Sequence, residues 1–259
     1  MRDPGLNQAI HAAGGISALA RRLGIAQPSV SNWTKVPPER VLAVESATGI
    51  RREMLRPDLY EDFPAMSAEV DDVDLARAQE YALLALLLSR APDDMFLQRL
   101  ATLQVDANPL GVAHAVLAEA ARQTGAERVG REYFDLFIGL GRGELLPYGS
   151  YYLTGFLHER PLARLRGDLA AIGIARAEDN PEPEDHAAIL CEIMSGVISH
   201  AFEAPQGTDR QLFEKHIAPW IGRFFADLER AESAQFYRAV GTVGRVFIEV
   251  ETQAFAFPS

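Results

Sequence analysis

The chain has 259 residues, 48% of them hydrophobic and 24% charged, which is the composition of a globular protein and excludes a disordered or fibrous one. Residues 1–60 carry eight bases and five acids, whereas residues 61–259 carry 17 bases and 31 acids. This asymmetry predicts two modules with different partners, phosphate for the first and a basic ligand for the second. Cys191 is the single cysteine, and the longest apolar run, Tyr81–Leu88, is too short for a membrane span, so we expect a cytoplasmic protein without disulfides.

Helical periodicity runs through almost the whole sequence and predicts an all-α fold. We expect a small helix-turn-helix domain at residues 1–60 (the head), a linker at 61–70 around Pro64, and a larger helical domain at 71–259 (the body). In the head, the predicted helices are Leu6–Ala13, Ser17–Leu23, Pro28–Thr34 and Pro38–Thr48.

Residues 16–33 have the spacing of a DNA-binding helix-turn-helix. A small residue, Ala20, is expected where the helices cross, and Gly24 permits the positive φ of the turn. The apolar positions expected between the helices are Leu19, Leu23, Ile25, Val30 and Trp33. The polar residues expected to face DNA are Gln27, Ser29, Ser31, Asn32 and Lys35. The alternative is a small helical domain whose polar face is only solvated.

The spacing from Gly14-Gly15 through Trp33 to the segment Val36–Arg40 resembles the YdaS/Cro-like subgroup of phage-type regulators over residues 5–60. The resemblance implies site-specific DNA binding. The net charge of the head is small for a phosphate-binding module, so we expect a homodimer to be needed.

In the body, we expect a central helix at Asp71–Ser89 that is apolar all round. The further predicted helices are Met95–Leu103, Pro109–Thr124, Glu127–Phe137, Ser150–His158, Pro161–Ile172, Pro183–Phe202, Asp209–Arg230 and Ser233–Gln253. The glycines of the segment Gly139–Gly143 allow close backbone approach, but the segment lacks the Gly-Lys-Ser/Thr ending of a phosphate-binding loop.

Two segments of the body suggest a peptide-binding groove. Tyr148, Ser150 and Tyr152 begin a helix, with Ser150 as the expected N-cap, and aromatic rings with a polar edge suit such a groove. The second segment is acidic and contains Glu178, Asp179, Glu182, Glu184 and Asp185, followed by His186. The alternatives are aromatic core packing for the first segment, and helix capping around Pro183 for the second.

The sequence favours a protein without enzymatic activity. Asp185 and His186 suggest a catalytic pair, but consecutive residues on a helix point about 100° apart and seldom bond each other. The sequence contains neither a nucleophile elbow nor a His-Glu-x-x-His metal motif, so we expect no cofactor or metal.

The phrases Tyr133–Gly139, Glu144–Leu153 and Glu182–His186 resemble the TorD/DmsD family of chaperones over residues 71–255. The resemblance implies a cytoplasmic chaperone for the maturation and twin-arginine export of a molybdopterin oxidoreductase, for which formate dehydrogenase is one candidate. Its implied partners are the signal peptide and the apo-form of that enzyme. The residues implied to bind the signal peptide are Tyr148, Gly149, Ser150, Tyr152, Glu182, Pro183, Asp185 and His186.

A transcription regulator whose helical body senses a small molecule remains the alternative. A sensor body is expected to hold a closed apolar pocket and a dimerising helix pair, whereas a chaperone body is expected to present an open acidic groove.

Overall fold

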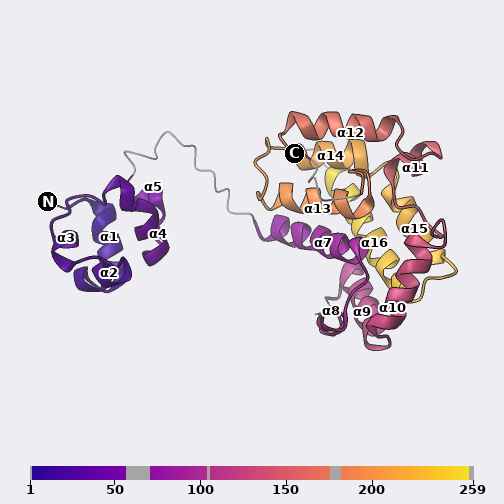
Figure 1. Cartoon of the computed structure of the whole chain (residues 1–259), viewed down its shortest axis with the longest axis horizontal. Coiled ribbons are helices and arrows are strands. Elements are labelled where there is room, and N and C mark those ends of the chain that lie inside the picture. The colour runs from indigo at the N-terminus through magenta and orange to yellow at the C-terminus, as the bar shows by residue number, and fades with distance from the viewer. Residues whose placement is uncertain (1, 57–70, 104–105, 176–181, 257–259) are drawn as a thin grey trace. The chain divides into compact units, whose positions relative to one another are not determined.

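The computed structural model describes residues 2–56, 71–103, 106–175 and 182–256 (Figure 1). Over these residues it contains helices and no strand, apart from an isolated antiparallel bridge between Tyr148 and His186. The predicted all-α fold is therefore confirmed. The chain separates into two compact units, Met1–Ala68 and Glu69–Ser259. The predicted linker at 61–70 lies outside the described residues.

The head is a bundle of short helices: α1 (Pro4–Ala13), α2 (Ile16–Arg22), α3 (Gln27–Ser31), a 3-10 turn at Pro38–Arg40, α4 (Val41–Thr48) and α5 (Arg52–Leu55). The expected apolar residues Leu19 and Val30 are fully buried, and Leu23, Ile25 and Trp33 pack against the same core. Gly24 has the positive φ of 65° that the turn was predicted to need.

Two details of the head differ from prediction. Helix α3 ends at Ser31 rather than Thr34, where the Trp33 amide donates to the Val30 oxygen at 3.2 Å in a tighter turn. The prolines at 37 and 38 follow closely and disfavour helical backbone in the residue before them. Helix α5 was missed because four residues carry too little periodicity to be recognised.

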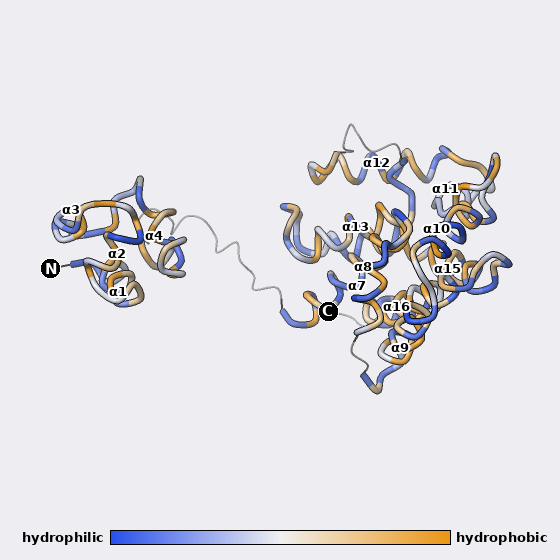
Figure 2. Tube along the Cα trace, turned by 60° about the horizontal axis from the view of Figure 1, so that its bottom comes forward, coloured by the Kyte–Doolittle hydropathy of each residue, from blue (hydrophilic) through white to orange (hydrophobic). Residues whose placement is uncertain are grey.

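The body packs around two helix pairs, α7 (Asp72–Ser89) against α13 (Ala187–Ile198), and α15 (Ile221–Arg230) against α16 (Phe236–Ala256). The other helices are α8 (Asp94–Leu100), α9 (Pro109–Arg122), α10 (Ala126–Tyr133), α11 (Gly149–Thr154), α12 (Arg160–Ala171) and α14 (Thr208–Leu212). Apolar and polar positions alternate along the helices (Figure 2), and the apolar ones form one continuous core. Among the described residues, no helix is long and apolar enough to cross a membrane.

Several predicted helices of the body are shorter or broken. The predicted helix Asp209–Arg230 is interrupted by a π-helical turn at Phe213–Ile217, and α15 starts only at Ile221. A second π-helical turn, Phe134–Ile138, follows α10. Helix α11 ends at Thr154 because Gly155 adopts the left-handed conformation, and its N-cap is Tyr148, not Ser150.

The predicted helix Pro183–Phe202 begins four residues later than expected. Its N-cap is His186, and Pro183 does not occupy the first helical position. The Ala187 amide instead donates to the Pro147 oxygen at 2.8 Å, and the Gly149 amide donates to the Asp185 oxygen at 2.9 Å. The segment before the helix thus forms a turn, with the His186 amide donating to the Pro183 oxygen at 3.0 Å, and it pairs with a distant segment, which sequence periodicity does not report.

Helix α7 was expected to be buried all round, but one side is exposed. Leu75 and Leu86 are 44% and 45% exposed, respectively, while Leu84 and Leu87 are fully buried. The glycine-rich segment does show the expected close approach, since a Cβ at Gly143 would lie 2.5 Å from the backbone of Phe137.

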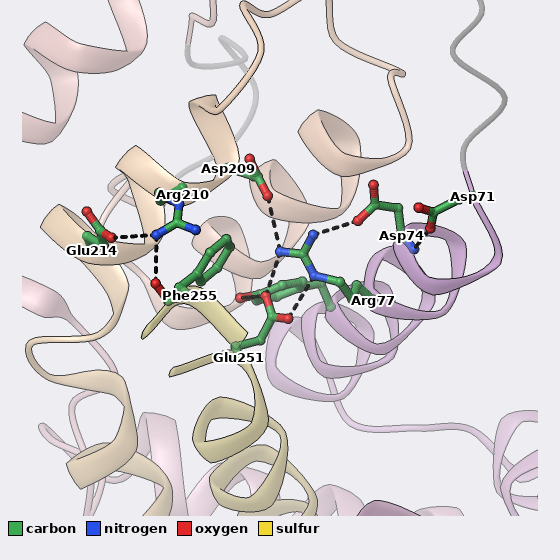
Figure 3. Close-up of polar contacts among 9 residues, drawn as sticks. Asp71, Asp74, Arg77, Asp209, Arg210, Glu214, Glu251 and Phe255 are labelled. Carbon is green, nitrogen blue, oxygen red and sulfur yellow. Dashed lines mark hydrogen bonds and ion pairs between the residues drawn. The ribbon is translucent and has the colours of Figure 1, made fainter. Parts of the chain in front are cut away.

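An ion-pair network holds the first turns of α7 to α14 and α16 (Figure 3). Arg77 donates two hydrogen bonds to Glu251, from Nε at 2.8 Å and from Nη2 at 2.9 Å, and a further one to Asp209 at 3.1 Å. The Tyr81 hydroxyl donates to the same Glu251 at 3.1 Å. The guanidinium also lies 5.0 Å from the centre of the Phe255 ring. This network fixes α7, which packs against α13.

Candidate functional site: a cleft between two helices

The expected aromatic and acidic residues meet at the N-terminal end of α13. The Tyr148 hydroxyl donates to Glu182 Oε2 at 2.7 Å, and the rings of Tyr148 and His186 lie edge to face at 5.0 Å. Burial and the hydrogen bond with Glu182 raise the pKa of Tyr148, so its hydroxyl stays protonated and remains a donor. The two sequence segments predicted to form one site are therefore in contact.

Asp185 points inward at this corner. It is 3% exposed, and its Oδ2 accepts the Ser150 amide at 2.7 Å, which secures the first turn of α11. Neither Asp185 Oδ1 nor the Ser150 hydroxyl has a hydrogen-bond partner among the described residues. This carboxylate thus positions α11 against the start of α13.

Glu184 is also engaged within the chain. Its carboxylate accepts hydrogen bonds from Arg166 Nε at 3.0 and 2.9 Å and lies 2.8 Å from Arg166 Nη2. These bonds raise the pKa of Arg166. Of the other predicted acids, Glu178 and Asp179 lie outside the described residues. Glu182 is the one carboxylate of this described segment that lines the cleft.

The imidazole of His186 caps α13, because its Nδ1 accepts the Ala188 amide at 3.1 Å. Burial lowers the pKa of His186 despite the opposing charges of Glu182 and Asp185. A neutral ring that accepts at Nδ1 must carry its proton on Nε2. The ring lines the cleft and therefore offers it a hydrogen-bond donor.

A cleft of about 650 Å³ runs between α7 and α13 from this corner. Small and apolar residues, including Ala85, Leu86 and Ile189, line its middle. At the far end the Phe202 ring lies so close to Gly196 that a Cβ there would collide with it. The charged residues that line the cleft are Glu182 and Glu192, and no lysine or arginine is among the described lining residues.

Not every predicted site residue faces the cleft. Gly149 and Asp185 line a second, smaller hollow of about 440 Å³ beside Trp220. Tyr152 is directed toward α15, where its hydroxyl donates to Asp227 at 3.0 Å and its ring lies 5.5 Å from that of Trp220. Pro183 is buried.

Sequence reasoning missed several cleft residues, including Leu86, Glu192, Gly196 and Phe202. On α13 the lining positions are 188, 189, 192, 195 and 196, followed by the C-cap at 199, and they recur every three or four residues. That spacing places these residues on one face of the helix and can be recognised in the sequence. The sequence does not show that α7 packs beside this face.

In the head, four of the five residues predicted to face DNA are exposed: Gln27, Ser29, Asn32 and Lys35. Ser31 is half-buried and accepts a hydrogen bond from Gln27 Nε2 at 2.8 Å. Asn32 caps the C-terminal end of α3, and Lys35 follows the helix rather than lying on it.

Each of the two units is similar to a known protein family. Residues 104–226 match the family model described as nitrate reductase delta subunit, and residues 6–64 match that described as bacterial toxin YdaS. Chaperone protein TorD of Vibrio atlanticus (strain LGP32) is 24% identical over 135 residues, 48% of this chain and 63% of the relative. Both resemblances are confirmed.

Other relatives extend the same likeness. Chaperone protein TorD of Shewanella pealeana is 22% identical over 212 residues, 72% of this chain and 93% of the relative. Chaperone protein TorD of Vibrio cholerae serotype O1 (strain N16961) is 26% identical, and the chain spans 62% of its length. A crystal structure from Archaeoglobus fulgidus, named for redox enzyme maturation, aligns with a TM-score of 0.46 at 18% identity, over 73% of this chain and 99% of that chain. Each of these three curated relatives is named as a chaperone.

Proposed function

We propose that the body is a cytoplasmic chaperone for a molybdopterin oxidoreductase and that it binds the twin-arginine signal peptide of that enzyme. The observation that carries the proposal is the α7–α13 cleft, which combines an apolar middle with the carboxylates of Glu182 and Glu192. A peptide with two guanidiniums followed by an apolar segment complements such a surface in charge and polarity. The likeness to TorD chaperones supports the same assignment.

Each group at the polar end has a defined role in this proposal. Glu182 is held by the Tyr148 hydroxyl and binds a guanidinium. The Nε2–H of His186 donates to a backbone carbonyl of the peptide. Asp185 and Ser150 act indirectly, by holding α11 against the start of α13. At Gly149 an added Cβ would lie 3.0 Å from Trp220 Nε1, so a larger residue there would require the tryptophan to shift.

The test is calorimetric titration of the full chain with a peptide that carries two adjacent arginines and an apolar segment. Binding should weaken as salt increases, and Glu182→Gln should weaken it further, because an ion pair is lost. Glu159→Gln is the matched control: it removes the same charge from an exposed residue at the start of α12. Equal affinity for a peptide with both arginines replaced by glutamine would refute the proposal.

The client is proposed to be the apo-form of a molybdoenzyme, with formate dehydrogenase as the first candidate to test. The chaperone itself should turn over no substrate, and its effect should appear as increased cofactor occupancy or export of the client. The alternative, a body that senses a small molecule, has less support, because the exposed Leu86 and Glu192 indicate an open cleft rather than a closed pocket.

We further propose that the head binds DNA as a homodimer through the exposed Gln27, Ser29 and Asn32, with Ser31 and Lys35 beside them. Replacing Asn32 by alanine should relax preference at one base pair, by about 1–3 kcal/mol. Replacing Lys35 should weaken binding to all sequences alike. Selection from random duplexes by the full chain measures both effects, and failure to enrich any sequence at low salt would contradict DNA reading.

A further inference from the structure

Glu192 differs from Glu182 and Glu184 in having no partner among the residues that the structure describes. Glu182 is bonded to Tyr148, and Glu184 to Arg166. Glu192 is exposed and forms no hydrogen bond or ion pair with any residue that the structure describes. It nevertheless lines the cleft rather than open surface. Because this carboxylate is exposed and has no cation beside it among the described residues, it remains available to a cationic ligand.

The two cleft carboxylates lie at different points of the chain: Glu182 precedes α13, and Glu192 lies on it. Tyr133 indicates which helix ends meet: its hydroxyl donates to the Leu88 oxygen at the end of α7, and its side chain lines the cleft together with Glu182 and His186 at the start of α13. The C-terminal end of α7 therefore lies beside the N-terminal end of α13. Glu192 is six residues beyond His186, about 9 Å further along the helix.

We propose that Glu192 is the second cation-reading residue of the cleft, so that Glu182 and Glu192 each bind one of two neighbouring arginines of the peptide. This inference rests on the function proposed above. In an extended peptide, successive side chains leave the backbone in opposite directions. Two adjacent guanidiniums therefore need carboxylates at two separate points, which a single acidic cluster does not provide. The apolar segment of the peptide then lies along Leu86 and Ile189 toward Phe202.

The test is a double-mutant cycle by calorimetry on the full chain. The protein variants are Glu182→Gln, Glu192→Gln and the control Glu159→Gln. Three peptides are compared: one with both arginines, one with the second arginine replaced by glutamine, and one with the first arginine replaced by glutamine. Glu192→Gln should lower the affinity for the two-arginine peptide about fivefold, as expected for a charged hydrogen bond at a half-open site. Glu192→Gln should have almost no effect on the affinity for the peptide that lacks the arginine bound by Glu192. In the same way, Glu182→Gln should have almost no effect on the affinity for the peptide that lacks the other arginine.

The outcomes separate this inference from the proposed function. If Glu192→Gln has no effect, or lowers affinity by the same factor for every peptide, Glu192 does not read an arginine, while coupling between Glu182 and one arginine would still support the signal-peptide site. If the affinity depends on neither arginine, the proposed function itself is wrong. Because Glu192 is exposed and unpaired among the described residues, its replacement should leave the melting temperature unchanged, and a circular dichroism melt checks this.

Discussion

Replacing Glu251 by alanine should destabilise the body more than replacing an exposed member of a surface ion pair. Glu251 is 1% exposed and accepts two hydrogen bonds from Arg77 and one from Tyr81. Burial would lower the pKa of Arg77, yet its hydrogen bonds, above all with Glu251, raise it above the usual value. Truncating one member of such a pair leaves the other buried without compensation.

The expected magnitude follows from what Arg77 retains. Breaking a buried ion pair typically costs about 3–5 kcal/mol. Arg77 is 17% exposed and keeps Asp74 at 2.6 Å and Asp209 at 3.1 Å, so we expect the lower end, about 3 kcal/mol. For a unit of this size, the melting temperature should fall by about 6–12 °C. Differential scanning calorimetry of the full chain measures this shift.

The matched control is Glu249→Ala, on the same helix. Glu249 is 58% exposed and pairs with Arg245 at 2.8 Å, so its loss should cost no more than about 0.5 kcal/mol. The double replacement Arg77→Met with Glu251→Leu should recover most of the lost stability, since it removes both charges together. If Glu251→Ala melts at the same temperature as Glu249→Ala, the network does not anchor α7 as described.

Three further outcomes are expected. Because burial lowers the pKa of His186, the contribution of this residue to the free energy of unfolding is present above pH 6.5 and lost as the pH falls. The variant His186→Asn keeps a capping residue, so its stability should be less sensitive to acid, and denaturant titrations at several pH values measure this. The pH dependence of His114 should be opposite, because the hydrogen bond with Glu80 raises the pKa of His114. Its contribution to the free energy of unfolding is present below pH 6.5 and lost as the pH rises, so His114→Gln should cost more stability in acid than in base. Asp185→Asn should keep an acceptor for the Ser150 amide and most of the affinity for the two-arginine peptide. Asp185→Ala should lower both the thermal stability and the affinity. Equal affinities of the two variants would show that Asp185 does not act by positioning α11.

The features that sequence predicted well are those set by local chemistry. The φ of Gly24 and the burial of Leu19 and Val30 follow from a turn and a helical spacing within one short segment. The start of α13 was mispredicted because Pro183 and the acids before it look like a helix N-terminus. Pairing of Pro147 and Gly149 with the residues at 185–187, far apart in the sequence, overrides that local preference.

The sequence predicted only part of the site, because tertiary packing decides which residues of the motif line the cleft. The phrase Glu182–His186 reads as one acidic stretch, yet its members have different surroundings: Asp185 faces inward, Glu184 binds Arg166, and Glu182 lines the cleft. Because residues 183–186 form a hydrogen-bonded turn rather than the first turn of a helix, helical spacing does not predict where their side chains point, and a single motif can both build the corner and present a carboxylate to a ligand. The second carboxylate of the cleft, Glu192, lies on α13 itself, and the packing of α7 on α13 gives it its place at the cleft without any motif to mark it.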